Sequence, residues 1–352
     1  MAFPFARTAA ALLAAPVLAL SFALPASASA IAVRSRPPVG DWHLSPSTGQ
    51  TTDQAATLAS TAQSTGVVLI DTTIDYGIGA AAGTGLVLSS DGIVVTNHHV
   101  VEGSTQVEVT DPATDTNYTA DVVGYDPLTD VAVLKLEDAS NLATVTTDTS
   151  AIAEGDDVTA VGNSNGGGVL TASAGEVTDT SSDITVSADD GSTEHLTDLI
   201  EVDATVVPGD SGGALLDSDG EVVGMNVAAD SSGTTGYAIG IQTVLTLADQ
   251  ILDGDASGTV TLGYGPALGL QLSAHGSELL VVGVVDGSAA DQAGVTPGSV
   301  LTQFNGKQLS SYSALTTAMS KLSPGDTATI GWTDQTGATQ AATVTLGRAP
   351  LA

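Results

Sequence analysis

The sequence predicts a mainly β protein, with two antiparallel β-barrels followed by a smaller C-terminal domain. Between residues 66 and 241, short runs rich in Val, Ile and Leu alternate with Gly, Asp and Ser turn signals. That spacing is typical of antiparallel barrels and sandwiches. Regular helical periodicity is nearly absent from the same region, which argues against a parallel α/β sheet. A length of 352 residues leaves room for two domains, each with its own core.

The first thirty residues indicate a targeting segment, a signal peptide, rather than part of the fold. Arg7 is their only charge, an apolar run interrupted by Pro16 follows, and residues 26–30 offer small-residue cleavage sites. We expect cleavage after Ala28 or Ala30 and a secreted or extracytoplasmic location. An uncleaved membrane anchor is the weaker alternative, because the run is short and broken by proline for a spanning helix.

The composition excludes several classes of partner. The formal net charge of −33 repels nucleic acid and anionic lipid, so neither is expected as a main partner, and no later stretch is long and apolar enough to span a bilayer. The absence of cysteine excludes disulfides and thiolate sites. The acidity fits either a high-salt habitat or simple solubility, and the sequence does not separate the two.

Residues 31–65 are expected to form a flexible lead-in with one short helix over 54–64. The alternating pattern then predicts a barrel domain over residues 66–252, closed by a helix over 244–252. Its predicted strands span 67–70, 85–88, 93–96, 107–109, 119–123, 131–136, 158–161, 171–177, 199–202, 214–216, 222–227 and 237–241.

A stretch of small and polar residues, 253–260, is predicted to be a linker. Residues 261–352 are predicted to form the C-terminal domain. A short helix is expected over 289–293, ended by Gly294. A second is expected over 312–322, where apolar residues recur at helical spacing before Pro324 and Gly325. The predicted strands of this domain span 268–272, 279–285, 300–304, 328–332 and 342–346.

The stretch 208–213 (PGDSGG) places Ser211 between glycines at the end of an apolar run. A serine hydroxyl becomes a useful nucleophile only when a base accepts its proton and donors stabilise the oxyanion that it creates. Glycines permit a turn sharp enough to aim backbone amides at one point. Taken alone, a glycine-rich β-turn is the better interpretation, so a base and its orienting group are needed elsewhere.

Two upstream stretches supply candidates for those groups. Residues 96–100 (TNHHV) contain His98 and His99, two of only five histidines. Residues 126–130 (DPLTD) precede an apolar strand, and an aspartate that is buried there needs a partner such as an imidazole N–H. The resulting chain order, His then Asp then Ser, differs from the orders of α/β-hydrolases and subtilisins.

Taken together, these three motifs resemble the active-site signatures of the HtrA (Deg-type) serine proteases. Supporting matches lie at residues 83–85 (GTG), 160–163 (AVGN), 224–226 (GMN) and 236–239 (GYAI). The resemblance extends from about residue 66 to the C-terminus and implies a chymotrypsin-like pair of barrels followed by one PDZ domain.

The resemblance implies a role for each motif residue. Ser211 corresponds to the nucleophile, His99 to the general base and Asp130 to the group that orients His99. The oxyanion hole corresponds to the turn Gly209, Asp210 and Ser211, through the amides of Gly209 and Ser211. Asp210 stands where many members have Asn. His98 is expected to be structural, and the chemistry implies no cofactor and no metal.

The primary specificity pocket is expected at Thr205, Val206, Val227 and Ala228. Thr205 lies six residues before Ser211, where trypsin-like relatives place the acidic residue that binds Lys and Arg. We therefore expect cleavage after small or medium aliphatic residues.

In the C-terminal domain, Leu268, Gly269 and Leu270 resemble the carboxylate-binding loop of a PDZ domain. Such a loop holds a peptide C-terminus through consecutive amides while the next strand pairs with the peptide. Leu315 and Met319 are candidates for the opposite groove wall, and plain core packing is an equal interpretation for each of them.

The predicted function is a secreted serine endopeptidase that cleaves unfolded or exposed polypeptides, with the PDZ domain binding peptide C-termini. The alternative is a peptide-binding quality-control chaperone with weak or conditional proteolysis, and an esterase is a more remote one. The resemblance also implies a homo-oligomer, a trimer formed through N-terminal contacts. The lead-in holds few aromatic residues for such packing. Residues 217–221 (DSDGE) are too short for a calcium loop and are expected to form a hairpin turn.

Overall fold

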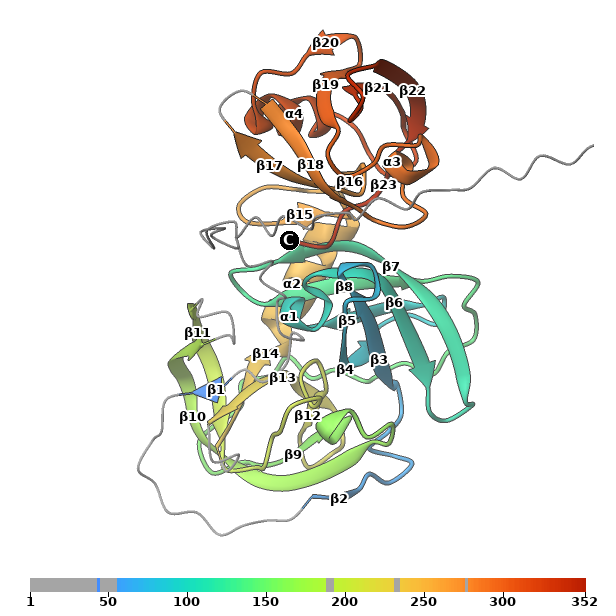
Figure 1. Cartoon of the computed structure of the whole chain (residues 1–352). Coiled ribbons are helices and arrows are strands. Elements are labelled where there is room, and N and C mark those ends of the chain that lie inside the picture. Colours follow the sequence, from blue (N-terminus) through green and yellow to red (C-terminus); the bar gives the residue numbers. More distant parts are fainter. Residues whose placement is uncertain (1–42, 45–55, 188–192, 231–234, 276–277) are drawn as a thin grey trace, which may run out of the picture. The chain divides into compact units, whose positions relative to one another are not determined.

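The computed structural model describes residues 43–44, 56–187, 193–230, 235–275 and 278–352. The expected signal peptide, residues 1–30, and most of the lead-in lie outside the described residues. The described chain is mainly β-structure, in two six-stranded barrels, a six-stranded C-terminal sheet and a two-stranded sheet of β16 and β23 (Figure 1). The predicted fold class is confirmed.

The first barrel is closed by pairing between its last two strands. Its order is β7-β6-β3-β4-β5-β8, and β7 also pairs with β8. In β6 the buried Val107 and Val109 alternate with the exposed Gln106 and Glu108, the period of a strand with one face in a core. The strands are β3 (Val67–Ile74), β4 (Gly79–Val87), β5 (Ile93–Thr96), β6 (Ser104–Asp111), β7 (Thr116–Asp126) and β8 (Val131–Leu136).

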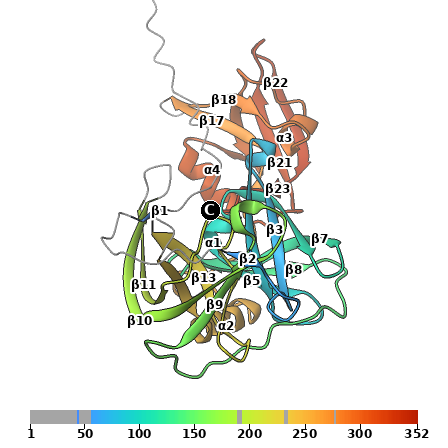
Figure 2. The ribbon, with the colours of Figure 1, turned by 90° about the horizontal axis from the view of Figure 1, so that it is seen from below.

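The second barrel has the order β9-β10-β11-β14-β13-β12 and is closed by pairing of β12 and β10 with β9. Two short strands, β1 (His43–Leu44) and β2 (Thr57–Leu58), join β10 from outside. Figure 2 shows β9, β10, β11 and β13 of this barrel from below. The barrel strands are β9 (Asp157–Gly162), β10 (Thr171–Ser187), β11 (Thr193–Val202), β12 (Ala214–Leu216), β13 (Val222–Asp230) and β14 (Gly236–Gly240).

Helix α2 (Ile241–Leu252) packs on both barrels. It buries Ile241, Val244, Ala248 and Ile251, which recur at the spacing of one helical face. These side chains belong to one core cluster with Val131 and Val133 of β8 and with residues of the second barrel. The two barrels therefore share apolar packing, which fixes the turns that lie between them.

Short elements complete the barrel region. Helix α1 (His98–Val101) follows β5 directly, and two 3-10 turns, η1 (Asp75–Gly77) and η2 (Ser164–Gly166), lie in loops. After α2, the strand β15 (Thr261–Leu262) pairs with β7 of the first barrel. Within the described part of the chain, α2 with 12 residues is the longest helix, and no helix combines the length and apolarity that a membrane crossing needs.

The C-terminal sheet has the order β17-β18-β19-β21-β22, so β17 is an edge strand. Ser288 and Ser311 cap the two helices by accepting the amides of Asp291 and Ala314. The elements are β16 (Pro266–Ala267), β17 (Leu270–His275), β18 (Glu278–Val284), α3 (Ala289–Gln292), β19 (Val300–Phe304), β20 (Lys307–Gln308), α4 (Tyr312–Met319), β21 (Thr327–Thr333), β22 (Thr339–Thr345) and β23 (Gly347–Arg348).

Two expectations differ from the structure. The helix expected over 54–64 is absent from its described part, because Thr57–Leu58 pairs with β10 and is followed by turns, such as that closed by Ser64 N to Ser60 O at 3.0 Å. Residues 261–262, expected in the C-terminal domain, instead extend the first barrel's sheet. The secondary structure of both segments is determined by hydrogen bonds to strands that are distant in the chain. Local periodicity in the sequence does not encode such pairing.

Candidate active site

His99 and Asp130 form the centre of the candidate site, and both are buried, at 5% and 0% exposure. Asp130 Oδ2 accepts from His99 Nδ1 at 2.7 Å, and Asp130 Oδ1 accepts from the His99 backbone N–H at 2.9 Å. Both oxygens of the Asp130 carboxylate therefore accept hydrogen bonds from His99. Since a carboxylate accepts, the hydrogen lies on Nδ1, and Nε2 is left as the basic nitrogen.

The two residues are held in place by the ends of neighbouring strands. β5 ends at Thr96 and α1 begins at His98, while Asp130 directly precedes β8, which pairs with β5. Asn97 adds a bond from Nδ2 to Asp130 O at 3.0 Å. Asp126, the other acid of its motif, caps its own turn through Leu128 N and accepts from Thr259 Oγ1 at 2.8 Å, so it is structural.

Ser211 lies on a turn that leaves no room for side chains at its glycines. A Cβ on Gly209 would lie 2.3 Å from Asn163 O, and one on Gly212 would lie 2.1 Å from Thr84 O. Both glycines also have positive φ, at 93° and 82°, which L side chains rarely adopt. The glycines of the motif are required by the local packing and the backbone conformation together.

The amides of Gly209 and Ser211 are oriented through the carbonyls of their own peptide planes. Pro208 O accepts from Asn165 N at 2.6 Å, and Asp210 O accepts from Gly213 N at 2.9 Å. In a trans peptide the N–H and the C=O point in opposite directions. The N–H of Gly209 therefore points away from Asn165, and the N–H of Ser211 points away from Gly213. Among the described residues, neither amide donates to a protein acceptor. The two N–H groups are available for another acceptor.

Thr84 is a site residue whose role sequence reasoning missed, although its GTG motif was noticed. It is fully buried in β4, and its Oγ1 donates to Gly209 O at 2.7 Å and accepts from Asn163 N at 2.9 Å. Its backbone N–H donates to Ser211 O at 2.9 Å. Asn163, from the noticed AVGN motif, also accepts from Gly168 N at 2.8 Å. These bonds connect the serine turn to the first barrel.

Asp210 points into the protein beneath the turn, and burial raises its pKa to about 6. Its carboxylate accepts from Val207 N at 2.9 Å and from Ser164 Oγ at 2.8 Å, and both bonds oppose that rise. Gly162 lies against it, since a Cβ there would come within 2.6 Å of Asp210 Cα. The side chain thus connects the turn to Ser164 in η2 and packs against the end of β9.

The Ser211 side chain donates to Val227 O at 3.3 Å, which is a long hydrogen bond. Val227 belongs to β13, and its neighbour Asn226 accepts from Gly212 N and donates to Gly213 O. A hydroxyl has one hydrogen, so donation to Val227 and donation to His99 exclude each other.

The expected pocket residues lie in two segments: Val227 and Ala228 belong to β13, and Thr205 and Val206 precede the serine turn. Val206 and Val227 are buried at 2% and 1% exposure and belong to core clusters of the second barrel. Thr205 donates its N–H to Ser173 Oγ at 2.9 Å, and Ala228 follows in β13, paired with Tyr237. Their role as a specificity pocket stays a prediction.

In the C-terminal domain, the expected peptide-binding loop precedes the edge strand β17. Leu268 is buried in the domain core, and Gly269 has a φ of 72° and packs so closely that a Cβ would lie 2.2 Å from Ser288 Cβ. Leu270 begins β17. Leu315 is a core residue at 3% exposure, while Met319 packs against the same core and is half-buried. Peptide binding at this edge stays a prediction.

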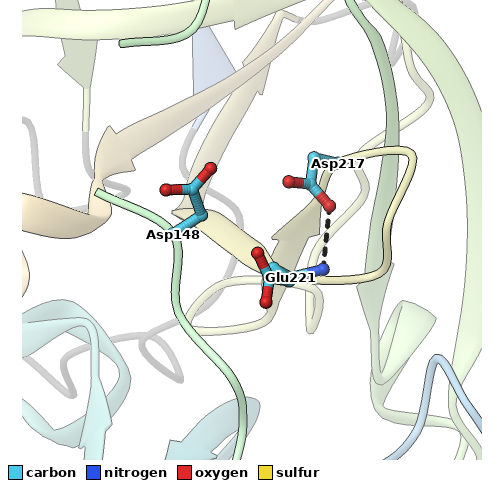
Figure 3. Close-up of side chains that lie close together, drawn as sticks. All are labelled: Asp148, Asp217 and Glu221. Carbon is cyan, nitrogen blue, oxygen red and sulfur yellow. Dashed lines mark hydrogen bonds between the residues drawn. The ribbon is translucent and has the colours of Figure 1, made fainter. Parts of the chain in front are cut away.

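One group of carboxylates meets the spacing of a metal site. Asp148, Asp217 and Glu221 offer oxygens within 4.8 Å of one another (Figure 3). Asp217 Oδ1 also accepts from Glu221 N at 2.8 Å and from Asp219 N at 3.0 Å, so it closes the turn between β12 and β13. The expected hairpin turn is confirmed.

Two family models match the chain. The model for a trypsin-like peptidase domain matches residues 83–225, and the model for a PDZ domain matches residues 266–346. The chain thus carries a trypsin-like peptidase domain followed by a PDZ domain.

The chain is similar in sequence to relatives that are named as serine proteases. A probable periplasmic serine endoprotease, DegP-like, from Chlamydia muridarum is 38% identical over 262 residues, which cover 70% of this chain and 50% of that protein. A serine protease Do-like HtrA from Lactococcus lactis is 34% identical over 138 residues, 38% of this chain and 33% of its own length. The chain is homologous to the HtrA (DegP) serine proteases, and it spans half or less of the length of these relatives.

A solved structure described as the HtrA-type protease AlgW with a tripeptide is 27% identical. The alignment covers 84% of this chain and 99% of that chain, with a TM-score of 0.48.

Proposed function

We propose that the chain is an exported serine endopeptidase in which Ser211 is the nucleophile, His99 the general base and Asp130 the residue that orients His99. The observation that carries this proposal is the double hydrogen bond from His99 N and Nδ1 to the buried Asp130 carboxylate. Homology to serine endoproteases and the order of the three motifs support it.

In the proposed reaction, Ser211 Oγ attacks the peptide carbonyl and its proton moves to His99 Nε2. The Asp130 carboxylate stabilises the imidazolium without taking the proton. The negative oxygen is stabilised by the amides of Gly209 and Ser211, each worth about 3 kcal/mol by the usual effect of removing one such donor. His99 then protonates the leaving amine, and water attacks the acyl-enzyme by the same route in reverse. No cofactor is required.

We further propose that the enzyme cleaves unfolded or exposed polypeptides after small or medium aliphatic residues. The absence of an acid at Thr205 and the apolar Val206 and Val227 support this preference. Cleavage profiling on a peptide library tests it, and a preference for Lys or Arg before the cut would overturn it.

The PDZ domain is proposed to bind peptide C-termini at Leu268, Gly269 and Leu270, with the peptide added as a strand beside β17. The edge position of β17 supports this mode, because an edge strand presents unpaired backbone groups. Titration with peptides bearing a free C-terminal carboxylate, compared with C-terminally amidated copies, tests it. Equal affinity for both forms would contradict it.

Export is proposed from the sequence of residues 1–30 and from the description of the Chlamydia relative as periplasmic. N-terminal sequencing of the secreted protein tests the cleavage after Ala28 or Ala30. A homo-trimer is the oligomeric state that the resemblance implies, and light scattering of the mature protein measures it.

The proposed activity is tested by labelling the mature protein with a fluorophosphonate probe. Labelling of the wild type, loss of labelling in Ser211→Ala and cleavage of casein are expected. A wild type that is neither labelled nor active on casein would refute an assembled protease.

The second candidate function is a peptide-binding chaperone with conditional proteolysis. It is favoured by the Ser211 Oγ contact with Val227 O at 3.3 Å, an acceptor other than the proposed base. Suppression of aggregation that is equal in wild type and Ser211→Ala, together with weak labelling, would favour this function.

A further inference from the structure

We call the six residues after the last long PDZ strand, 347–352, the strap. They begin in β23, which pairs with β16, and continue onto the first barrel. Leu351 is 2% exposed and belongs to the core cluster of that barrel, together with Val100 and Val101 of α1. Arg348 forms an ion pair with Asp121 of β7, and its carbonyl accepts from Tyr76 Oη at 2.6 Å. The strap is therefore fixed by both apolar packing and polar contacts.

The strap contacts both ends of the helix that carries His99. Beyond the C-terminal end of α1, Gly103 N donates to Leu351 O at 2.8 Å and Leu351 N donates to Ser104 O at 3.0 Å. At the N-terminal end, His98 Nε2 lies 2.9 Å from Ala352 O. A carbonyl only accepts, so His98 Nε2 carries the hydrogen of this bond.

His98 is held by a second contact that fixes its ring plane. The ring stacks on Tyr125 of β7, with centroids 4.6 Å apart and an interplanar angle of 11°. Its side chain is 3% exposed, although it is adjacent to the proposed base. His98 thus connects the strap and β7 to the first residue of α1.

Helix α1 depends on such contacts because it contains only four residues. A single helical turn is unstable on its own, since its nucleation cost is not recovered by further hydrogen bonds. The contacts to Asp130 position one side of the turn, and the strap packs on Val100, Val101 and both ends. A 1 Å displacement of a reacting group is enough to lower a rate by about 100-fold.

We propose that the strap is a positioning element for His99, acting through Leu351 and His98. It rests on the proposed function of His99 as the general base. The effect of the strap is to hold α1 so that the His99 ring meets both Asp130 and the substrate-bound serine.

The test uses the full mature chain with four variants. Leu351→Ala weakens the strap's apolar contact, and Leu142→Ala is the matched control, because Leu142 is a leucine buried in the same core at 8% exposure. His98→Phe keeps a ring that stacks on Tyr125 and removes the donor to Ala352. His98→Gln restores a donor without the ring.

Three quantities are measured: the rate of fluorophosphonate labelling, kcat and KM on a short C-terminally amidated peptide, and amide hydrogen exchange over residues 98–104. Leu351→Ala and His98→Phe are expected to lower labelling and kcat by about 10- to 100-fold with little change in KM, and to speed exchange. His98→Gln is expected to recover part of the loss. Leu142→Ala is expected to lower the melting temperature while leaving labelling at 25 °C unchanged.

Labelling at the wild-type rate in Leu351→Ala and His98→Phe, with faster exchange over 98–104, would overturn the proposal. An equal loss in Leu142→Ala would also overturn it, because the effect would then follow general destabilisation. If wild-type Ser211 is not labelled, the proposed function fails instead. If Leu351→Ala does not fold, the comparison of His98→Phe with His98→Gln decides the matter.

Discussion

Thr84 Oγ1 donates to Gly209 O at 2.7 Å and thereby connects strand β4 of the first barrel to the serine turn of the second. The same oxygen accepts from Asn163 N at 2.9 Å, so its donor and acceptor capacities are both used on the turn's surroundings. The serine turn is held by a residue more than a hundred positions away in the chain.

Thr84→Val is expected to lower the labelling rate and kcat by about 10- to 100-fold, whereas Thr84→Ser is expected to keep most of both. Valine has a similar shape but leaves Gly209 O and Asn163 N without their partner, and an unsatisfied buried group costs about 1–3 kcal/mol. Labelling kinetics of the two variants measure the effect. Equal rates for valine and serine would show that shape alone is needed.

Asp130→Asn is expected to lower kcat on a peptide substrate by about four orders of magnitude, with a small change in KM. An amide has one acceptor oxygen where the carboxylate has two, so it cannot accept from His99 N and Nδ1 through separate oxygens, and it favours the wrong tautomer of the imidazole. Single-turnover kinetics beside Ser211→Ala give the size of the loss. A loss below tenfold would remove Asp130 from the proposed mechanism.

Asp210 should give the protein a pH-dependent stability. Its pKa is raised from 3.8 to about 6, mainly by burial, so the folded state binds this proton more tightly than the unfolded state does. Stability from this group is therefore greatest below pH 4 and falls as the pH rises to about 6.

Asp210→Asn removes that titration. Between pH 4 and pH 7, the free energy of unfolding of the variant should rise by about 3 kcal/mol relative to that of the wild type. A pKa shift of two units corresponds to that free energy. Any change in hydrogen bonding adds a constant offset at all pH values. Urea unfolding of both proteins at the two pH values measures the gain, and parallel stability curves would contradict the raised pKa.

Gly212 and Gly220 allow the effect of crowding to be separated from the effect of backbone conformation. Both have a φ of 82°, but a Cβ on Gly212 would lie 2.1 Å from Thr84 O, whereas one on Gly220 meets nothing within 4 Å. Gly220→Ala should cost about 1 kcal/mol of stability, the cost of a left-handed alanine. Gly212→Ala should cost about 3 kcal/mol or more, because the turn must move. Thermal unfolding measures both, and equal losses would mean that the turn tolerates a side chain.

The sequence by itself determined the fold class, the two-part organisation and the residues of the proposed chemistry. Alternating apolar residues such as Val107 and Val109 locate strands without any tertiary information, because a strand's side chains alternate between faces. Several strands, including Ile93–Thr96, Val131–Leu136 and Val300–Phe304, have the predicted bounds. The motifs at His99, Asp130 and Ser211 are local in sequence, and their resemblance to the family's signatures implied the proposed roles.

The tertiary structure decided what connects those motifs. The bonds of Thr84 to the serine turn, the pairing of Thr57–Leu58 with β10 and the docking of Leu351 beside α1 all join residues far apart in the chain. Such contacts form because closed barrels bring the ends of distant strands together. A local sequence pattern does not encode which distant residue will hydrogen-bond a given amide or pack against a given side chain. The sequence thus named the reacting groups, while the fold determined what holds them.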